Sequence, residues 1–199
     1  VLAAQGYAVF MPNPRGSSGR GGGFQGANRY DFGGGDFDDI MTGIDALIER
    51  GVADADRLGI CGWSFGGFMT AWAVTQTDRF KAGVAGAAPT NWISKIGTTD
   101  IRPANEWNIG VVNSEPEVVW KVSPMRYAGQ AKTPTLVVHG NADVRVPVTQ
   151  GWEFYNALHA NGVDAEMVAY PRQGHAFHER AAQLDLLKRL ISWFEKYLV

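Results

Sequence analysis

The sequence contains a single cysteine and no long apolar segment, and its charges nearly cancel. A lone thiol, Cys61, cannot form a disulfide within the chain and fits a reducing compartment, so we expect a cytoplasmic protein. No run of 18 apolar residues is present, which excludes a membrane-spanning helix on sequence grounds. Because 18 basic residues stand against 20 acidic ones, nothing favours nucleic acid or an anionic membrane as a partner.

The chain has enough apolar material for one domain. It has 199 residues, 45% of them hydrophobic, and a chain of this length buries roughly 70% of its unfolded surface. Neither an internal repeat nor a linker interrupts residues 1–199. We expect strands at residues 6–11, 57–61, 81–87, 135–139 and 164–170, and helices at 36–50, 68–74, 147–160 and 184–198, with a partly helical excursion at 91–134. This alternation predicts an α/β fold, with a mostly parallel sheet covered by helices on both faces.

One short motif carries most of the chemical information. Gly62-Trp63-Ser64-Phe65-Gly66-Gly67 follows an apolar strand segment and precedes a helical one. A G-x-S-x-G in that context is typical of a serine nucleophile on a strained strand-to-helix turn. We expect glycine at 62 and 66 because a Cβ at either position would collide with the closely packed turn. Cys61, in the strand below, is expected to be a small buried residue rather than a second nucleophile.

A serine nucleophile needs a base and a group that orients the base. Asp143 follows the apolar segment that starts at Thr135, and His175 follows the segment ending at Tyr170. Since each of the three residues follows a predicted strand, all three should lie at the edge where the strands end. The order Ser, Asp, His is that of the α/β-hydrolase fold. We therefore predict a catalytic triad of Ser64, Asp143 and His175.

Metal and nucleotide cofactors are not expected. His178 lies three residues after His175, but no further ligand stands at metal spacing nearby, and His139 is interpreted as a packed histidine. Gly21 to Gly26 spell a literal G-x-G-x-x-G, yet the next helical pattern begins only near Asp36, an expected N-cap. This glycine-rich stretch is better explained as a surface loop.

At this point the sequence resembles a known family. The motifs are Arg15-Gly16-Ser17-Ser18-Gly19, the segment around Ser64, His139-Gly140-Asn141-Ala142-Asp143, Gly174-His175, Pro89-Thr90-Asn91-Trp92 and Trp120-Lys121-Val122-Ser123-Pro124. Together they resemble the catalytic domain of the prolyl oligopeptidase family, in its acylaminoacyl peptidase and dipeptidyl aminopeptidase branch. The resemblance implies a serine hydrolase that cleaves short peptides or N-acylated amino acids through an acyl-enzyme. It also implies an α/β-hydrolase fold.

The resemblance also implies a substrate pocket. The backbone N–H of Phe65 would supply one oxyanion contact. Phe65, Trp92 and Val146 match the family's positions for the acyl-side pocket, with Ile93 and Ile96 as weaker matches. These residues are apolar, so a preference for hydrophobic side chains is expected, while burial of Trp92 and Ile96 as ordinary core is the alternative.

The sequence departs from the family pattern at its beginning. The chain starts at Val1 without an initiator methionine, and the glycine-pair loop that supplies a second oxyanion donor is absent, as are the first strands. We therefore expect a catalytic-domain fragment lacking the N-terminal region of its parent, with bare strand edges that would favour homo-oligomers. Two alternatives to peptidase activity stay open: a carboxylesterase of the same fold and a catalytically silent fragment.

Overall fold

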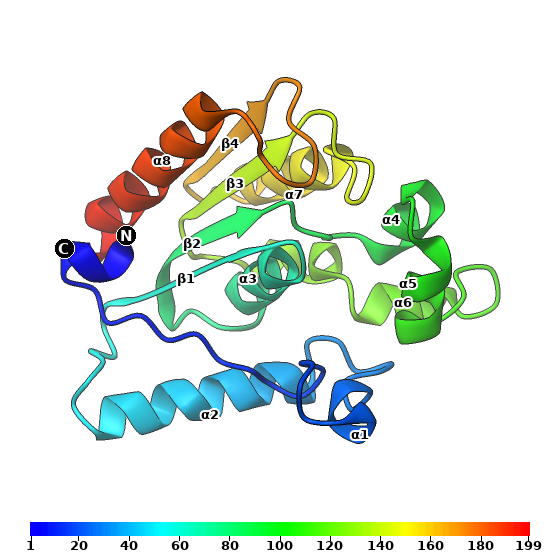
Figure 1. Ribbon diagram of the computed structural model, residues 1–199, viewed down its shortest axis with the longest axis horizontal. Coiled ribbons are helices and arrows are strands. Elements are labelled where there is room, and N and C mark those ends of the chain that lie inside the picture. The colour runs from blue at the N-terminus through cyan, green and yellow to red at the C-terminus, as the bar shows by residue number, and fades with distance from the viewer.

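A four-stranded parallel sheet lies at the centre of the computed structural model, which describes residues 1–199 (Figure 1). Its strands, in spatial order, are β1 (Leu58–Trp63), β2 (Phe80–Gly86), β3 (Thr135–Gly140) and β4 (Ala165–Tyr170). In register, Trp63 pairs with Gly86, and Gly140 pairs with Tyr170. The strands therefore end at one common edge, as the sequence predicts.

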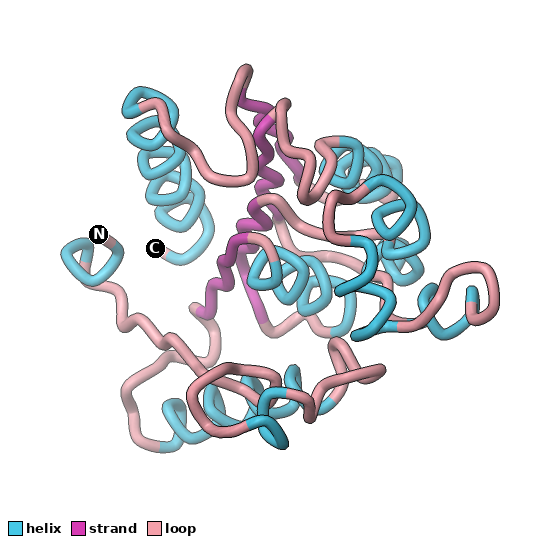
Figure 2. Tube along the Cα trace, turned by 45° about the vertical axis from the view of Figure 1, so that its right-hand side comes forward, coloured by secondary structure: helices cyan, strands magenta, loops and turns pink.

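Helices cover both faces of this sheet (Figure 2). On one face α3 (Phe65–Gln76) and α7 (Thr149–Ala160) bury Val74 and Phe154 against Ala85 and Val137. On the other face α8 (Arg180–Leu198) packs Trp193, Phe194 and Leu198 over strands β2 and β3. The predicted fold class, an α/β-hydrolase fold with helices on both faces, is confirmed. No helix combines the length and the apolar character needed to cross a bilayer.

Helix α2 (Gly35–Glu49) lies beside α3 and buries Ile44 against Ala73. The helix ends at Glu49 with Arg50 as its C-cap, and the next residue, Gly51, has a φ of +67° that suits glycine. The expectation that Asp36 is the N-cap is wrong, because Asp36 lies inside the first turn and is fully buried. Its carboxylate instead accepts hydrogen bonds from the N–H groups of Gly33 and Phe37 and from Asn28 Nδ2. Asp36 thus fixes the loop that precedes the helix.

The excursion between β2 and β3 is partly helical, as expected. It contains α4 (Trp92–Thr98), α5 (Arg102–Ile109), α6 (Pro116–Lys121) and the 3-10 helix η2 (Pro124–Gln130). The N-terminal region adds η1 (Leu2–Gln5) and the single turn α1 (Gly22–Gln25). In Figure 1 the helices α4, α5 and α6 gather beyond the ends of the strands. The excursion therefore adds a helical layer next to the edge where the predicted triad lies.

The predicted first strand, residues 6–11, does not form. The segment is extended, but residues 8–11 donate no backbone hydrogen bond to another segment, and Val9, Phe10 and Met11 are exposed. Figure 1 shows it running alongside β1 without joining the sheet. A strand needs a paired neighbour to satisfy its backbone groups, and this segment is hydrogen-bonded to no strand.

The same open edge corrects the expectation for Cys61. Strand β1 pairs only with β2, so its other edge is uncovered. Cys61 is exposed there rather than buried. Its exposure follows from the position of β1 in the sheet, which the local sequence does not specify.

Candidate active site

Ser64 occupies a strained turn between β1 and α3. Its φ of 60° and ψ of −114° lie outside the regions that residues with a Cβ normally adopt. The Ser64 N–H donates to Gly86 O at 2.9 Å, which ties the turn to β2. This backbone geometry lifts the hydroxyl above the strand end, as the motif predicts.

The glycines around Ser64 are not equivalent. A Cβ at Gly62 would lie 2.3 Å from the backbone of Gly66, and one at Gly67 would lie 2.2 Å from Gly86 O. A Cβ at Gly66 would meet no atom within 4 Å. The expected crowding is therefore confirmed at Gly62 but wrong at Gly66, because the Cα hydrogen of Gly66 that a Cβ would replace points into open space. The second crowded position is Gly67.

The three predicted triad residues come together through two short hydrogen bonds. His175 Nε2 lies 2.8 Å from Ser64 Oγ, and His175 Nδ1 lies 2.8 Å from Asp143 Oδ2. A carboxylate can only accept, so Nδ1 carries the proton and Nε2 is free to accept from the serine hydroxyl. His175 is partly exposed, whereas the side chain of Asp143 is fully buried. This arrangement places a base next to the hydroxyl on the open side of the sheet.

The loop after β3 holds Asp143 in place. Its Oδ1 accepts hydrogen bonds from the backbone N–H groups of Arg145 and Val146, each at 2.9 Å. These two donors leave Oδ2 for His175. The carboxylate orientation is thus set by the backbone of its own loop, which the sequence pattern alone did not indicate.

His139 is buried, as expected, and braces the same loop. Its Nε2 lies 2.7 Å from Val146 O and must donate a proton to that carbonyl. Burial lowers the pKa of His139, which keeps the ring neutral, and its Nδ1 has no partner. His139 therefore acts as a structural donor that fixes Val146 and, through it, the loop around Asp143.

The loop that carries His175 has its own anchor, which sequence reasoning missed. The indole Nε1 of Trp63 donates to His175 O at 2.8 Å. Trp63 also packs edge to face on Phe177, with ring centroids 5.0 Å apart. No local sequence pattern indicates this bond, because its donor and acceptor are 112 residues apart.

The oxyanion residue and the expected pocket residues differ in accessibility. Phe65 begins α3, where the first N–H groups have no intrahelical acceptor, and its side chain is 38% exposed. Trp92 and Val146 are buried, and Ile93 is partly buried. Trp92 and Ile96 share an apolar cluster with Phe68. The structure therefore leaves Phe65 exposed beside Ser64, whereas the other candidates are buried or partly buried.

A hydrogen-bond network fixes the segment that carries Trp92. The buried side chain of Gln150 accepts from the N–H groups of Thr90 and Asn91 and donates to Ser94 Oγ at 2.8 Å. Asn91 caps α4 by accepting from Ile93 N–H at 3.1 Å. The segment is therefore rigidly attached to α7.

Lys95 lies on the same helix and is almost completely buried. Its ammonium group sits 5.2 Å from the ring centroid of Trp92. Sequence reasoning overlooked it, although a lysine three residues after Trp92 falls on the same helical face. Lys95 therefore adds a charged group to the expected pocket, whose three predicted residues are all apolar.

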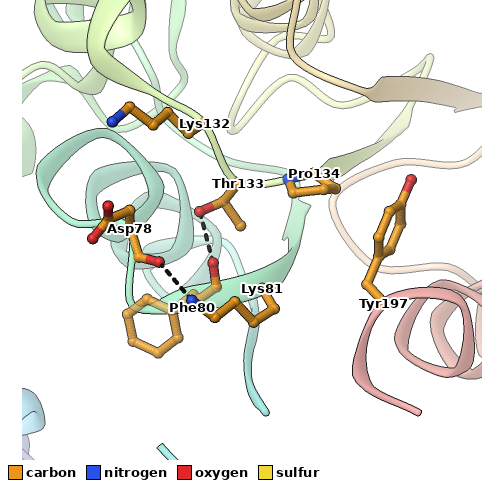
Figure 3. Close-up of a pocket in the computed structure, with 7 residues that line it drawn as sticks. All are labelled: Asp78, Phe80, Lys81, Lys132, Thr133, Pro134 and Tyr197. Carbon is orange, nitrogen blue, oxygen red and sulfur yellow. Dashed lines mark hydrogen bonds between the residues drawn. The ribbon is translucent and has the colours of Figure 1, made fainter. Parts of the chain in front are cut away.

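A separate shallow cavity lies far from this chemistry. It has a volume of about 320 Å³ and is lined at the amino ends of β2 and β3 by residues that include Phe80, Thr133 and Pro134 (Figure 3). The strands are parallel, so this is the edge opposite to Ser64. A hydrogen bond from Thr133 Oγ1 to Phe80 O closes part of it. It contains none of the triad residues.

Comparison with known proteins places this geometry in a family. The model of the prolyl oligopeptidase family, Peptidase_S9, matches residues 1–199. The "Uncharacterized peptidase YuxL" of Bacillus subtilis is 41% identical over 100% of this chain and 31% of its own length. The acylamino-acid-releasing enzyme of Rattus norvegicus is 31% identical, over 100% of this chain and 28% of its own length.

Solved structures agree with this assignment. An acylaminoacyl peptidase of Pyrococcus horikoshii superposes with a TM-score of 0.88 at 34% identity, covering 94% of this chain and 31% of that one. A puromycin-hydrolyzing peptidase of Mycobacterium tuberculosis gives a TM-score of 0.89 at 28% identity, covering 94% and 29%. The chain spans about a third of the length of these relatives. It belongs to the prolyl oligopeptidase family.

Proposed function

We propose that this chain forms the catalytic region of a serine peptidase that hydrolyses short peptides or N-acylated amino acids. The observation that carries the proposal is the continuous hydrogen-bonded series from Ser64 Oγ through His175 to Asp143, with both links at 2.8 Å. Such a series activates a hydroxyl that is otherwise a weak nucleophile near neutral pH.

Each residue has a defined part in the proposed reaction. Ser64 Oγ attacks the carbonyl carbon while His175 Nε2 takes the hydroxyl proton. The C–N bond then breaks as His175 returns that proton to the leaving amine, which leaves an ester on Ser64. Water attacks this ester with His175 again as the base, and the carboxylic acid product is released. Asp143 stabilises the imidazolium that forms at each step.

The negative charge that develops on the carbonyl oxygen needs hydrogen-bond donors. The Phe65 N–H, at the start of α3, is directed to that task by its position next to Ser64. An oxyanion site in this fold uses a second donor as well. Removing one donor typically lowers turnover by about a hundred- to a thousandfold. The turnover of this protein therefore depends strongly on a second donor.

The named relatives support the substrate class. The Pyrococcus horikoshii protein is described as an acylaminoacyl peptidase, and an acylaminoacyl peptidase has been solved in complex with Z-Gly-Gly-Phe-chloromethyl ketone. A third relative is a dipeptidyl-peptidase 5 from Porphyromonas gingivalis. We infer a peptide-like substrate for this chain by similarity to these proteins.

Labelling with a fluorophosphonate probe tests the proposed nucleophile. We expect one adduct, located at Ser64 by peptide mass spectrometry and absent from S64A. Turnover should fall by about 10⁴- to 10⁶-fold in S64A or H175A, because nucleophile and base act as a unit. A protein that remains folded but takes no probe at Ser64 would contradict the proposal.

A substrate comparison separates peptidase from esterase action. We expect hydrolysis of both an N-acetyl amino acid anilide and a p-nitrophenyl ester, each abolished in S64A. Cleavage of the ester alone would identify a carboxylesterase of the same fold. Probe labelling without turnover of either substrate would identify a silent module.

A further inference from the structure

Lys95 carries a positive charge that the fold leaves without a partner. The residue is 1% exposed, and its ammonium group forms neither a hydrogen bond nor an ion pair. Lysine is almost never fully buried unless it is paired, because removing an ammonium ion from water is costly without compensating contacts. This position on α4 therefore has a use for the charge that the packing of the chain does not explain.

The two carboxylates nearest to this charge are already engaged. Asp100 forms a bidentate ion pair with Arg145, at 2.6 and 3.1 Å. Asp143 is occupied by His175 and by two backbone N–H groups. Neither carboxylate can turn toward Lys95 without breaking these contacts. Lys95 is therefore an unpaired cation near two carboxylates that are bound to other groups.

A second unpaired donor lies at the same place. The Lys95 ammonium packs against the ring of Trp92, and the buried indole Nε1 of Trp92 has no acceptor. Buried donors without acceptors are rare in folded proteins. This indole N–H and the unpaired ammonium lie on adjacent side chains, and an acceptor from outside the chain would satisfy both.

Lys95 is also placed close to the reacting groups. The end of α4 is joined to the loop of Asp143 by two hydrogen bonds, from Thr99 Oγ1 to Arg145 O at 2.7 Å and from Asp100 N–H to Val144 O at 3.2 Å. The helix therefore packs on the loop that orients His175. Because the Lys95 ammonium lies against Trp92, an expected residue of the acyl-side pocket, a group bound at Lys95 would lie in that pocket.

We propose that Lys95 forms a subsite for a carboxylate, so that the protein prefers substrates with an acidic residue on the acyl side of the scissile bond. This inference rests on the proposed function. It differs from the hydrophobic preference expected from Phe65, Trp92 and Val146, because the lysine adds a cation to the apolar wall. The carboxylate would pair with Lys95 and also reduce its repulsion with Arg145.

The protonation state of Lys95 supports this role. Burial, and to a smaller extent the charge of Arg145, lower its pKa to about 8, while Asp100 and Asp143 act in the opposite direction. The group is therefore mostly charged at pH 7 and loses its charge as the pH rises past 8. The preference for an acidic substrate should decline over the same range.

The test compares two substrates that differ only in charge: the 4-nitroanilides of N-acetyl-glutamate and N-acetyl-glutamine. We expect the full chain to show a kcat/KM at pH 7 about ten- to a hundredfold higher for the glutamate substrate, the range of a hydrogen bond between charged groups. In K95M the ratio should fall to about one or below. K95R keeps the charge and should retain a ratio well above one.

Controls separate this inference from general damage and from the proposed function. K81M removes an exposed lysine on β2 and should keep the wild-type ratio. The subsite would be overturned if the glutamate-to-glutamine ratio of kcat/KM fell in K95R as far as in K95M. It would also be overturned if the wild-type ratio were near one while Ser64 was labelled normally by the fluorophosphonate. Absence of labelling at Ser64 would instead overturn the proposed function, and this inference with it.

Discussion

Strand β2 and the segment from Gly6 to Met11 are both apolar and extended, but they are held in different ways. β2 is hydrogen-bonded to β1 on one side and β3 on the other, and all its residues except Lys81 are buried between two helical layers. The segment is bonded to no strand and leaves Val9 and Met11 in solvent. Extended conformation alone therefore contributes little to stability here, whereas strand pairing and burial contribute most of it.

The region before α2 is attached through several polar contacts as well as apolar ones. Arg15 binds Asp39 through its backbone N–H and through Nε and Nη2, at 2.7 to 2.9 Å. The buried carboxylate of Asp36 accepts hydrogen bonds from Asn28 and Gly33 of the preceding loop and from Phe37 N–H of α2 itself. The Phe10 ring, which lies over Gly43 of α2, is a smaller apolar contact. The sheet depends on apolar burial, whereas this region combines a few charged contacts with the packing of Phe32 against an apolar cluster.

The largest expected contrast is between Leu136 and Met11. Leu136, on β3, is 1% exposed, and truncation to alanine should reduce the free energy of unfolding by about 2 to 5 kcal/mol. Met11 is 82% exposed, so M11A should change it by less than about 0.5 kcal/mol. Urea unfolding of both variants measures the difference. Equal destabilisation would show that the segment contributes to the core.

The next contrast is in pH dependence. Burial raises the pKa of Asp36 from its usual 3.8 to about 6. The folded state therefore binds more protons than the unfolded state between these values, and its stability declines as the pH rises from 4 to 6. The linked loss is about 2 to 3 kcal/mol. D36N removes the titrating group, so the wild type should lose that amount relative to D36N between pH 4 and 7.

D38N supplies the matched control for Asp36. Asp38 is exposed on the same helix, and its removal should leave the pH slope as in the wild type. Asp39, whose pKa Arg15 lowers to about 2, is present in both wild type and D36N, so its contribution cancels in the comparison. If the free energies of unfolding of wild type and D36N changed in parallel with pH, the raised pKa of Asp36 would be contradicted.

The smallest expected effects concern the glycines of the turn. G67A should cost about 1 to 3 kcal/mol, because its Cβ would press on the carbonyl of Gly86. G66A should be neutral or stabilising by up to about 1 kcal/mol, since the position is helical and unobstructed. Thermal unfolding of the two variants provides the test. Greater damage from G66A would show that the turn is tighter than described.

Most elements could be predicted from the sequence because their patterns are local. The strands after Arg57 and the helices from Asp36 onward were found at their expected places. Errors came where a neighbour decides the outcome: residues 6–11 lack a partner strand, and Cys61 is exposed because β1 is an edge. The crowding at Gly66 was overestimated, because it depends on the direction of one Cα hydrogen in the folded turn.

For the site, the order of Ser64, Asp143 and His175 and their places after successive strands were enough to predict that they meet. A parallel sheet brings strand ends to one edge whatever lies between them. The supporting contacts could not be read in this way, because the Trp63 bond to His175 O spans 112 residues and the His139 bond to Val146 O depends on a loop closing over a ring.

The sequence by itself determined the fold class and the meeting of Ser64, Asp143 and His175, since periodicity and strand-end position are properties of short segments. Only the tertiary structure decided that Lys95 is buried without a counterion, because Asp100 and Asp143 had to be seen bound to other partners. Whether a charge is paired depends on residues brought together by folding, and no local pattern contains that information.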